Sequence, residues 1–295
     1  MYSNGASFMQ LANMVQDRAA CFQFLQQRSI LHNPRLCANC NAPMKENLWK
    51  GYRWRCSARG CRTEVGVRVG TWLEKANLPY GKIIMFLYAW SREEASIDFC
   101  KHELDIGHNS VVEWSNFARE VCAADLLANP LVIGGPGTVV EVDESLFSRR
   151  KNHQGRVLPQ QWVFGGICRE TRESFMYTVP DRSEATLLSI IQQSVLPGAT
   201  IMSDMWAAYG SIAAMGLTHL QVNHTYNFVD PVTGAHTQNI ENSWKNAKSR
   251  NKRQHGTHRA MVDSYLCEWM WRQRNRNVNL FDKIFQDIAI HFPPA

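Results

Sequence analysis

The run Val139-Val140-Glu141-Val142-Asp143 is rich in β-branched residues and ends in a carboxylate. β-Branched side chains favour strands because they pack well on a pleated surface. A second run of this kind, Thr200-Ile201-Met202-Ser203-Asp204, also ends in an aspartate. The two runs predict a sheet in which acidic side chains stand at the ends of two strands.

The sequence around these two runs alternates between strand and helix patterns. Apolar runs bounded by turn residues predict further strands over residues 161–168, 174–179 and 217–223. Helical periodicity predicts helices over residues 183–193, 207–215, about 237–250 and 259–275. Residues 136–295 are therefore expected to form an α/β domain with a mixed sheet and flanking helices.

A third acidic residue, Glu241, lies in the helix expected at about 237–250, and 36 residues (205–240) separate it from Asp204. Carboxylates are hard oxygen ligands of the kind that Mg²⁺ takes in proteins. Two divalent ions about 3.5–4 Å apart can activate a water or hydroxyl and stabilise the leaving oxygen of a phosphodiester. A lone aspartate after a strand is more often a solvated acid, but the order of Asp143, Asp204 and Glu241 favours a site for Mg²⁺ or Mn²⁺.

Four cysteines near the N-terminus have the spacing of a metal site. Cys37 and Cys40 are separated by two residues, Cys56 and Cys61 by four, and the two pairs by 15. Two close thiolate pairs on two turns predict tetrahedral coordination of a structural Zn²⁺. Unrelated buried cysteines or two disulfides are the alternatives. The other five cysteines lie in apolar patterns and are expected to be core thiols: Cys21, Cys100, Cys122, Cys168 and Cys267.

The remaining N-terminal sequence is helical in pattern. Apolar residues recur at threes and fours over residues 7–28, and a helical block begins at Pro79. Ile97–Leu104 and Asn109–Asp125 have the layout of a helix-turn-helix, in which the second helix would read DNA. A three-helix bundle without a ligand has the same pattern, so both interpretations stay open.

The 295 residues carry 32 basic and 26 acidic side chains, and the excess is unevenly distributed. Residues 1–75 hold 11 basic and 4 acidic residues, whereas residues 76–135 hold 4 and 8. The stretch 245–276 holds 9 basic and 2 acidic residues. Two basic surfaces separated by an acidic segment indicate a polyanionic partner that is contacted in two places.

Other classes of protein fit the sequence poorly. The longest uninterrupted apolar stretch, Ile83–Trp90, is far shorter than the roughly 20 residues that span a bilayer. The N-terminus lacks a basic segment followed by an apolar run and a cleavage site. Nine cysteines cannot all pair in disulfides. The chain is therefore expected to be soluble and intracellular, with no membrane partner.

Four motifs follow the cysteine pairs in a fixed order. They are Asp143-Glu144, Ser203-Asp204-x-Trp206-x-x-Tyr209, Val222-Asn223-His224 and Thr237-x-Asn239-x-Glu241-x-x-Trp244-x-x-x-Lys248. This pattern resembles the DDE transposases of the Merlin type, which are related to small bacterial insertion sequences whose transposases begin with a zinc ribbon. The resemblance implies an N-terminal helix at 1–29, a zinc ribbon at 30–75, a helical DNA-binding region at 76–130 and a ribonuclease H-like catalytic domain at 136–295.

The resemblance also implies roles for single residues. Asp143, Asp204 and Glu241 would bind the catalytic metal ions, and Lys248 would contact a phosphate near the scissile bond. His224 would orient DNA or a carboxylate, with a packed structural histidine as the alternative. Further DNA contacts are expected from basic residues in a loop and on a helix: Arg149, Arg150, Lys151, Lys245, Arg250, Lys252 and Arg253. The aromatic residues Trp206, Tyr209 and Trp244 are expected in the core rather than against DNA.

The function implied is that of a DNA transposase, which cuts double-stranded DNA at transposon ends and joins the 3′ ends to target DNA. Such enzymes act as dimers or larger assemblies on paired ends. Residues 248–253 resemble a weak nuclear import signal, so a nuclear location is expected in a eukaryotic host and a cytoplasmic one otherwise. A host-domesticated DNA-binding protein, or a nuclease of the same fold without strand transfer, are the alternatives.

Overall fold

The computed structural model describes residues 6–47, 52–147, 160–224, 226–253 and 258–295, with the backbone alone for residues 250–253. The chain divides into two compact units. The first consists of Met1–Asp125 with Asn275–Ala295, and the second of Leu126–Arg274. Among the described residues, no helix has the length and apolar character needed to cross a bilayer.

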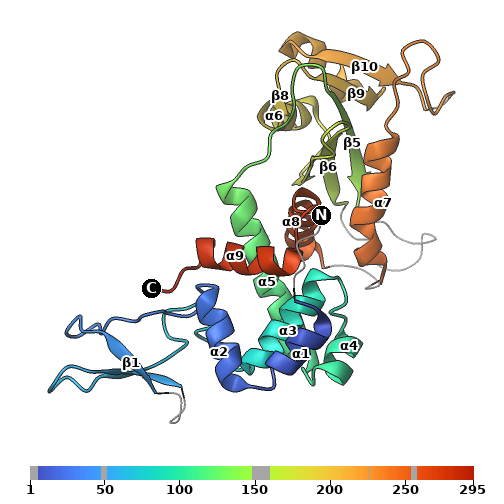
Figure 1. Cartoon of the computed structure of the whole chain (residues 1–295). Coiled ribbons are helices and arrows are strands. Elements are labelled where there is room, and N and C mark those ends of the chain that lie inside the picture. Colours follow the sequence, from blue (N-terminus) through green and yellow to red (C-terminus); the bar gives the residue numbers. More distant parts are fainter. Residues whose placement is uncertain (1–5, 48–51, 148–159, 225, 254–257) are drawn as a thin grey trace. The chain divides into compact units, whose positions relative to one another are not determined.

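The second unit is built on a five-stranded mixed sheet (Figure 1). Its strands are β5 (Val139–Leu146), β6 (Trp162–Cys168), β7 (Ser174–Val179), β9 (Thr200–Asp204) and β10 (Thr218–Val222), in the order β10-β9-β5-β6-β7. Strands β5, β6 and β7 pair antiparallel, whereas β9 pairs parallel with both β5 and β10. This confirms the mixed α/β sheet predicted from the strand runs.

Helices flank this sheet. They are α6 (Glu184–Ser194), α7 (Gln238–Arg253) and α8 (Val262–Arg274), the last preceded by the 3-10 turn η4 (Arg259–Met261). The short strands β4 (Ile133–Gly134) and β8 (Val195–Leu196) form a separate parallel pair. The helix predicted over 207–215 is instead two 3-10 turns, η2 (Ala207–Tyr209) and η3 (Ile212–Met215). Gly210 follows the first turn, and Gly216 ends the second in the left-handed region at φ 77°.

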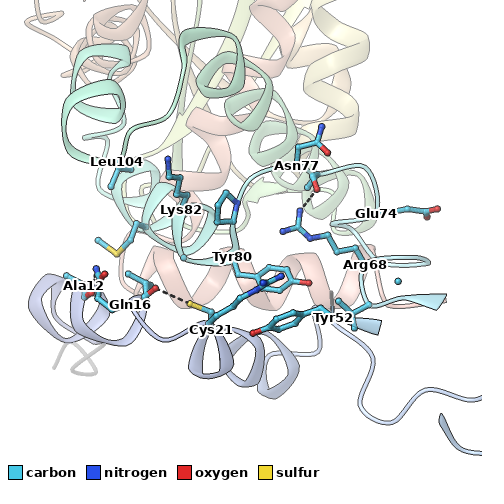
Figure 2. A pocket seen from close by; sticks show the side chains of 18 of the residues that line it. Ala12, Gln16, Cys21, Tyr52, Arg68, Glu74, Asn77, Tyr80, Lys82 and Leu104 are labelled. Atoms are coloured by element: carbon cyan, nitrogen blue, oxygen red, sulfur yellow. Dashed lines mark hydrogen bonds between the residues drawn. The ribbon is translucent and has the colours of Figure 1, made fainter. Parts of the chain in front are cut away.

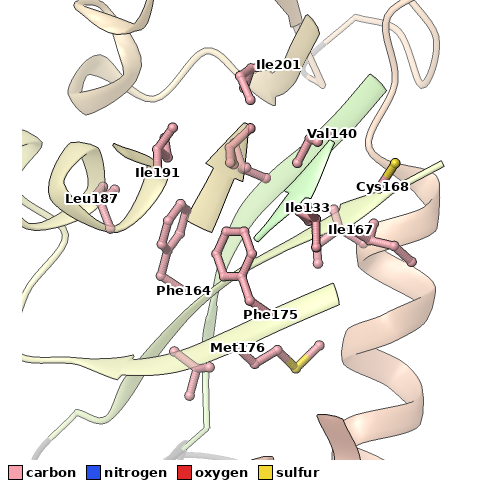
Figure 3. Close-up of a cluster of buried hydrophobic side chains, with 14 of the residues drawn as sticks. Ile133, Val140, Phe164, Ile167, Cys168, Phe175, Met176, Leu187, Ile191 and Ile201 are labelled. Atoms are coloured by element: carbon pink, nitrogen blue, oxygen red, sulfur yellow. The ribbon is translucent and has the colours of Figure 1, made fainter. Parts of the chain in front are cut away.

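The core of the second unit lies on both faces of the sheet, since it includes neighbouring strand residues such as Phe175 and Met176, which point to opposite faces (Figure 3). Val140 and Val142 alternate with Glu141 and Asp143 along β5, so the two pairs point to opposite faces. Val140, Phe164 and Ile191 are fully buried in one apolar cluster. Burying each such side chain contributes about 1.5–3 kcal/mol. The alternation on β5 therefore turns Glu141 and Asp143 towards the opposite face, where α7 contacts β5.

The first unit contains a small antiparallel sheet and several helices. The sheet has the order β1 (Met44–Asn47), β2 (Arg53–Cys56), β3 (Glu64–Gly66). The helix predicted over residues 7–28 is interrupted and forms α1 (Phe8–Met14) and α2 (Arg18–Gln27). The break occurs because the Asp17 side chain accepts a hydrogen bond from the backbone N–H of Ala19 at 2.8 Å and so begins a second helix.

The predicted middle helices are α3 (Tyr80–Ser91), α4 (Ile97–Glu103) and α5 (His108–Ala128). In α5, the proposed reading helix, Arg119 is only 2% exposed and is therefore not available to DNA phosphates. The last helix, α9 (Leu280–His291), groups with the first unit, although the predicted catalytic domain ran to residue 295. Aromatic packing explains this, because Phe285 lies 5.6 Å from Phe24 of α2 between ring centroids.

Candidate active site

Asp143 lies in the middle of β5, which continues to Leu146 instead of ending at this aspartate as predicted, whereas Asp204 is the last residue of the neighbouring parallel strand β9. The paired register of β5 and β9 includes Glu141 with Met202, and each aspartate lies two residues further along its strand. Burial raises the pKa of Asp143 to about 7, and the nearby carboxylates of Glu144 and Asp204 add to this shift. A divalent cation would favour the charged form instead. The two strands therefore form a carboxylate cluster, defined here as Asp143, Glu144 and Asp204.

Helix α7, which carries the third acidic residue, Glu241, lies along β5 (Figure 1). Glu241, Trp244 and Lys248 follow one another at helical spacing and so share one face of α7. The indole Nε1 of Trp244 donates to Asp143 Oδ2 at 2.9 Å. The ammonium of Lys248 donates to Ser145 Oγ at 2.5 Å. This face of α7 is thus in direct contact with the strand that carries Asp143.

A glycine on β6 makes room for the Trp244 ring. Gly165 is paired with Asp143 across the sheet. A Cβ atom on Gly165 would lie 2.8 Å from the Trp244 ring and 2.9 Å from the Phe175 carbonyl oxygen, which is closer than real Cβ contacts. Trp244 is 5% exposed, as expected for a core residue. The absence of a side chain at 165 therefore allows Trp244 to pack on the sheet and reach Asp143.

Glu141 is a positioning residue that sequence reasoning did not identify. Its carboxylate is fully buried and accepts hydrogen bonds from the backbone N–H groups of Asn239 at 2.8 Å and Ile240 at 3.0 Å. It also accepts from Arg169 Nε at 2.6 Å. A carboxylate at a helix N-terminus satisfies free N–H groups and interacts favourably with the helix dipole. Glu141 therefore fixes the start of the helix that carries Glu241.

Glu241 itself is held by two polar neighbours. Thr237 Oγ1 donates to Glu241 Oε1 at 3.2 Å, and His224 Nε2 lies 2.8 Å from the same hydroxyl. His224 Nε2 is 3.8 Å from Glu241 Oε1. These distances are in line with the predicted role of His224 in orienting a carboxylate. The Glu241 side chain remains 52% exposed, so it can adjust its rotamer.

The structure does not gather the oxygens of Asp143, Asp204 and Glu241 at one point. In the described part of the chain, two other groups of side chains bring all their ligand atoms within 4.8 Å of one another. The oxygen chemistry of the cluster nevertheless fits a hard cation. Glu144 Oε1 is buried without a hydrogen-bond partner among the described residues, while Glu144 Oε2 accepts from Tyr209 at 2.7 Å. An unpaired buried carboxylate oxygen is costly unless a cation or water meets it.

Arg182 is a second residue that sequence reasoning did not identify. Its Cζ lies 4.0 Å from the centroid of the Trp162 ring and 4.3 Å from that of Trp206. The backbone N–H of Trp206 donates to Asp204 Oδ1 at 2.9 Å. Burial raises the pKa of Glu144, and Arg182 acts in the opposite direction. Arg182 is therefore a cation beside the carboxylate cluster. The sequence gives little indication of this role, because an arginine shortly before a helix is common.

The other predicted DNA contacts are only partly within the described residues. Arg149, Arg150 and Lys151 lie outside them, and so do the side chains of three residues on α7: Arg250, Lys252 and Arg253. Lys245 is exposed on α7. Of the aromatic residues, Tyr209 is fully buried, whereas Trp206 is 39% exposed. Trp206 lies at the surface against Arg182, so the expectation that it is a core residue is wrong.

The four predicted zinc ligands come together in the first unit. Cys37 Sγ is 3.6 Å from Cys61 Sγ, and Cys40 Sγ is 3.4 Å from Cys56 Sγ. A tetrahedral site with Zn–S bonds of about 2.3 Å has sulfur–sulfur edges of roughly 3.8 Å. All nine cysteines are free thiols, so the disulfide alternative does not hold. The clustered sulfurs fit a Zn²⁺ ion.

The second compact group consists of Asp125, Asp287 and His291, also in the first unit. Lys283 already lies among these carboxylates, in an ion pair with Asp287 and 3.7 Å from Asp125. His291 Nε2 is 3.6 Å from Asp125. Because the Lys283 ammonium already lies between the two acids, this group acts as an ion-pair network that joins α9 to α5.

A cleft of about 980 Å³ opens in the first unit (Figure 2). Two arginines contact tyrosine rings in its wall: Arg18 lies 3.8 Å from the Tyr52 centroid and Arg68 4.5 Å from the Tyr80 centroid. Arg68 also donates to the carbonyl oxygen of Leu78 at 2.6 Å. All lining residues belong to the first unit, whereas the carboxylate cluster belongs to the second. The cleft is therefore not part of the candidate active site.

Comparison with known proteins shows that part of the chain is similar to transposases. Residues 135–274 match the family of the ISXO2-like transposase domain. A transposase-like protein of Haemophilus influenzae is 27% identical over 104 residues, which cover 35% of this chain and 83% of that protein. The matched range coincides closely with the second unit, Leu126–Arg274. The two matches show that parts of the chain are similar to transposases.

Two further similarities are to a nematode protein and to a solved structure. The male abnormal protein mab-31 of Caenorhabditis elegans is 26% identical over 222 residues, 65% of this chain and 50% of that protein. The chain thus spans about half the length of the nematode protein. Among solved structures, the HTLV-2 integrase catalytic core domain in complex with magnesium aligns with a TM-score of 0.32 and 11% identity, over 46% of this chain and 86% of the core domain.

Proposed function

We propose that this protein is a metal-dependent DDE transposase of the Merlin type, which cuts DNA at transposon ends and joins the freed 3′-hydroxyl to target DNA. One observation carries the proposal. Asp143 and Asp204 lie on neighbouring parallel strands, and α7, the helix that carries Glu241, contacts Asp143 through Trp244, all within the region that matches the transposase family. Carboxylates on two neighbouring strands and on a helix that packs against them are suited to hold the two divalent ions of phosphodiester chemistry.

Several residues of the second unit would have separate roles in such a reaction. Mg²⁺ or Mn²⁺ ions held by Asp143, Asp204 and Glu241 would supply an activated oxygen nucleophile and stabilise the leaving oxygen. Trp244 holds the Asp143 carboxylate in one orientation through its indole N–H. Lys248, seven residues after Glu241 on the same helix face, provides a positive charge for a phosphate near the scissile bond.

The first unit supports a binding role. We propose that Cys37, Cys40, Cys56 and Cys61 hold a structural Zn²⁺ ion, as their clustered sulfurs permit. A metal-bound module of this kind stabilises a segment that has little apolar core of its own. The excess of 11 basic over 4 acidic residues in 1–75, the range that contains this module, suits contact with the DNA backbone. Assembly as a dimer or larger complex on paired ends, and a nuclear location in a eukaryotic host, belong to the same proposal.

The test begins by selecting bound fragments from a genomic DNA pool, which identifies the ends. Cleavage and joining are then measured on these ends in Mg²⁺ or Mn²⁺. Asp143→Asn, Asp204→Asn and Glu241→Gln should each abolish cleavage while DNA binding is largely retained. Undiminished cutting by all three variants would refute the mechanism.

A joining assay with pre-cut 3′ ends separates the proposal from its rivals. Insertion of these ends into target DNA identifies a transposase. Hydrolysis without insertion would identify a nuclease of the same fold. Binding without any nicking would identify a DNA-binding protein that has lost the chemistry.

A further inference from the structure

Arg182 is held against two tryptophans at the surface of the second unit. It lies between β7, which ends at Val179, and α6, which begins at Glu184. Its Cζ is 4.0 Å from the Trp162 centroid and 4.3 Å from the Trp206 centroid. Its backbone carbonyl accepts a hydrogen bond from Trp206 Nε1 at 3.2 Å. Both cation–π contacts restrict the side chain, so its position is fixed before any ligand arrives.

The donors of this guanidinium are not used within the described part of the protein. No carboxylate or carbonyl oxygen among the described residues forms a hydrogen bond or ion pair with the Arg182 side chain. A guanidinium has five N–H donors in one plane. Contact through the ring faces leaves its edge, where the N–H groups point, for another partner. A structural arginine of comparable burial would normally use some of these donors, as Arg169 does with Glu141 at 2.6 Å.

The position of Arg182 relates it to the carboxylate cluster. The ring that it contacts belongs to Trp206, whose backbone N–H donates to Asp204 Oδ1 at 2.9 Å. A cation that stands beside acidic groups without pairing with them is suited to a ligand that is anionic and that approaches the same cluster.

We infer that Arg182 binds a backbone phosphate of DNA next to the carboxylate cluster, with Trp162 and Trp206 holding its guanidinium in place. The planar fork of N–H groups matches two phosphate oxygens, which a lysine cannot reproduce. The inference rests on the proposed function, since it takes DNA as the substrate of the cluster. It adds a phosphate contact from the α6 side of the site to the contact expected from Lys248 on α7.

The number of phosphate contacts can be counted from the salt dependence of binding. Each contact adds about 0.9 to the slope of log affinity against log salt concentration for duplex DNA. The probe is a random-sequence duplex oligonucleotide, bound to the Glu241→Gln protein so that cutting does not consume it. Arg182→Gln and Arg182→Met should each lower the slope by about 1. Arg182→Met keeps an unbranched chain against the two rings, so it decides the question if the glutamine variant unfolds.

Two further variants act as controls. Arg182→Lys keeps the charge and should keep the slope, while its affinity falls several-fold because the bidentate contact is lost. Arg92, an exposed arginine 5.2 Å from the Tyr88 centroid in the first unit, provides the matched cation–π control, and Arg92→Gln should leave the slope unchanged. An unchanged slope in Arg182→Met, or an equal fall in Arg182→Lys, would overturn the inference.

Cleavage by the wild-type protein separates this inference from the proposed function. If the selected ends are cut in Mn²⁺ and the slope of Arg182→Met equals that of its parent, the inference fails and the transposase proposal stands. If the wild-type protein neither binds duplex DNA nor cuts it, both fail together.

Discussion

The buried carboxylate of Glu141 accepts two hydrogen bonds from Asn239, one from its backbone N–H at 2.8 Å and one from its Nδ2 at 2.7 Å. Asn239 stands two residues before Glu241 on α7. The Glu141 side chain on β5 therefore fixes the start of the helix that carries Glu241. Arg169 balances the charge from the adjacent turn at 2.6 Å. The strand that presents Asp143 therefore also positions the helix that presents Glu241.

Glu141→Gln tests this arrangement. The variant leaves Arg169 without its anionic partner and removes the negative charge from the start of α7, so the free energy of unfolding of the second unit should fall by about 3 kcal/mol. Urea unfolding measures the change. Glu184→Gln is the matched control, because Glu184 is an exposed acid in the first turn of α6, where such a charge contributes about 0.3–1 kcal/mol. Equal losses in the two variants would contradict the positioning role.

Gly165→Ala should disturb the same site from the sheet. The added methyl group would meet the Trp244 ring at 2.8 Å and the Phe175 carbonyl at 2.9 Å, so Trp244 has to move away from Asp143. Overpacking of this kind costs about 1–3 kcal/mol, and a displaced catalytic group can cost about 100-fold in rate. Thermal unfolding and cleavage of the selected ends measure both effects. At Gly107 nothing lies within 4 Å of an added Cβ, so Gly107→Ala should change neither quantity.

Removal of zinc should unfold the part of the first unit that contains the four clustered cysteines and the strands β1, β2 and β3. The four thiols converge from turns and short strands, so the bound ion provides much of what orders this segment. Metal analysis should find one Zn²⁺ per chain. A chelator, or the change Cys56→Ser, should remove this ion. In both cases the amides of β1, β2 and β3 should also lose their protection in hydrogen exchange. Cys267→Ala should keep the metal, because Cys267 lies in the second unit, apart from the four clustered cysteines. Full zinc content in Cys56→Ser would contradict the assignment.

Patterns that act locally in the sequence predicted much of this fold. The β-branched runs before Asp143 and Asp204 became β5 and β9, and the cysteine spacing brought four sulfurs together. Both rest on short-range rules: strand propensity, strand-end chemistry and ligand spacing. The boundaries of helices were less accurate, because a single side-chain cap at Asp17 divides the helix predicted over 7–28.

Contacts between distant segments could not be predicted in this way. Glu141 meets Asn239 across 98 residues, and Arg182 meets Trp162 and Trp206 from two other elements. Neither pairing follows from periodicity or spacing, since each depends on how helices pack on the sheet. The assignment of α9 to the first unit has the same origin, because its aromatic residues pack on Phe24 rather than on the sheet that precedes them in sequence.

Two lysines on α7 provide the last test, because they share a helix but differ in what they touch. Lys248 donates to Ser145 on β5, two residues beyond Asp143, and its Nζ lies 4.9 Å from the Phe147 centroid. Lys245 is exposed. Lys248→Met should reduce the cleavage rate at saturating DNA by about 100- to 1,000-fold, the loss typical when one charge-stabilising group is removed, with little change in affinity. Lys245→Met should weaken binding in a salt-dependent way and leave the saturated rate unchanged. Single-turnover cleavage separates rate from affinity, and equal rate losses in the two variants would show that Lys248 acts only as one of several surface charges.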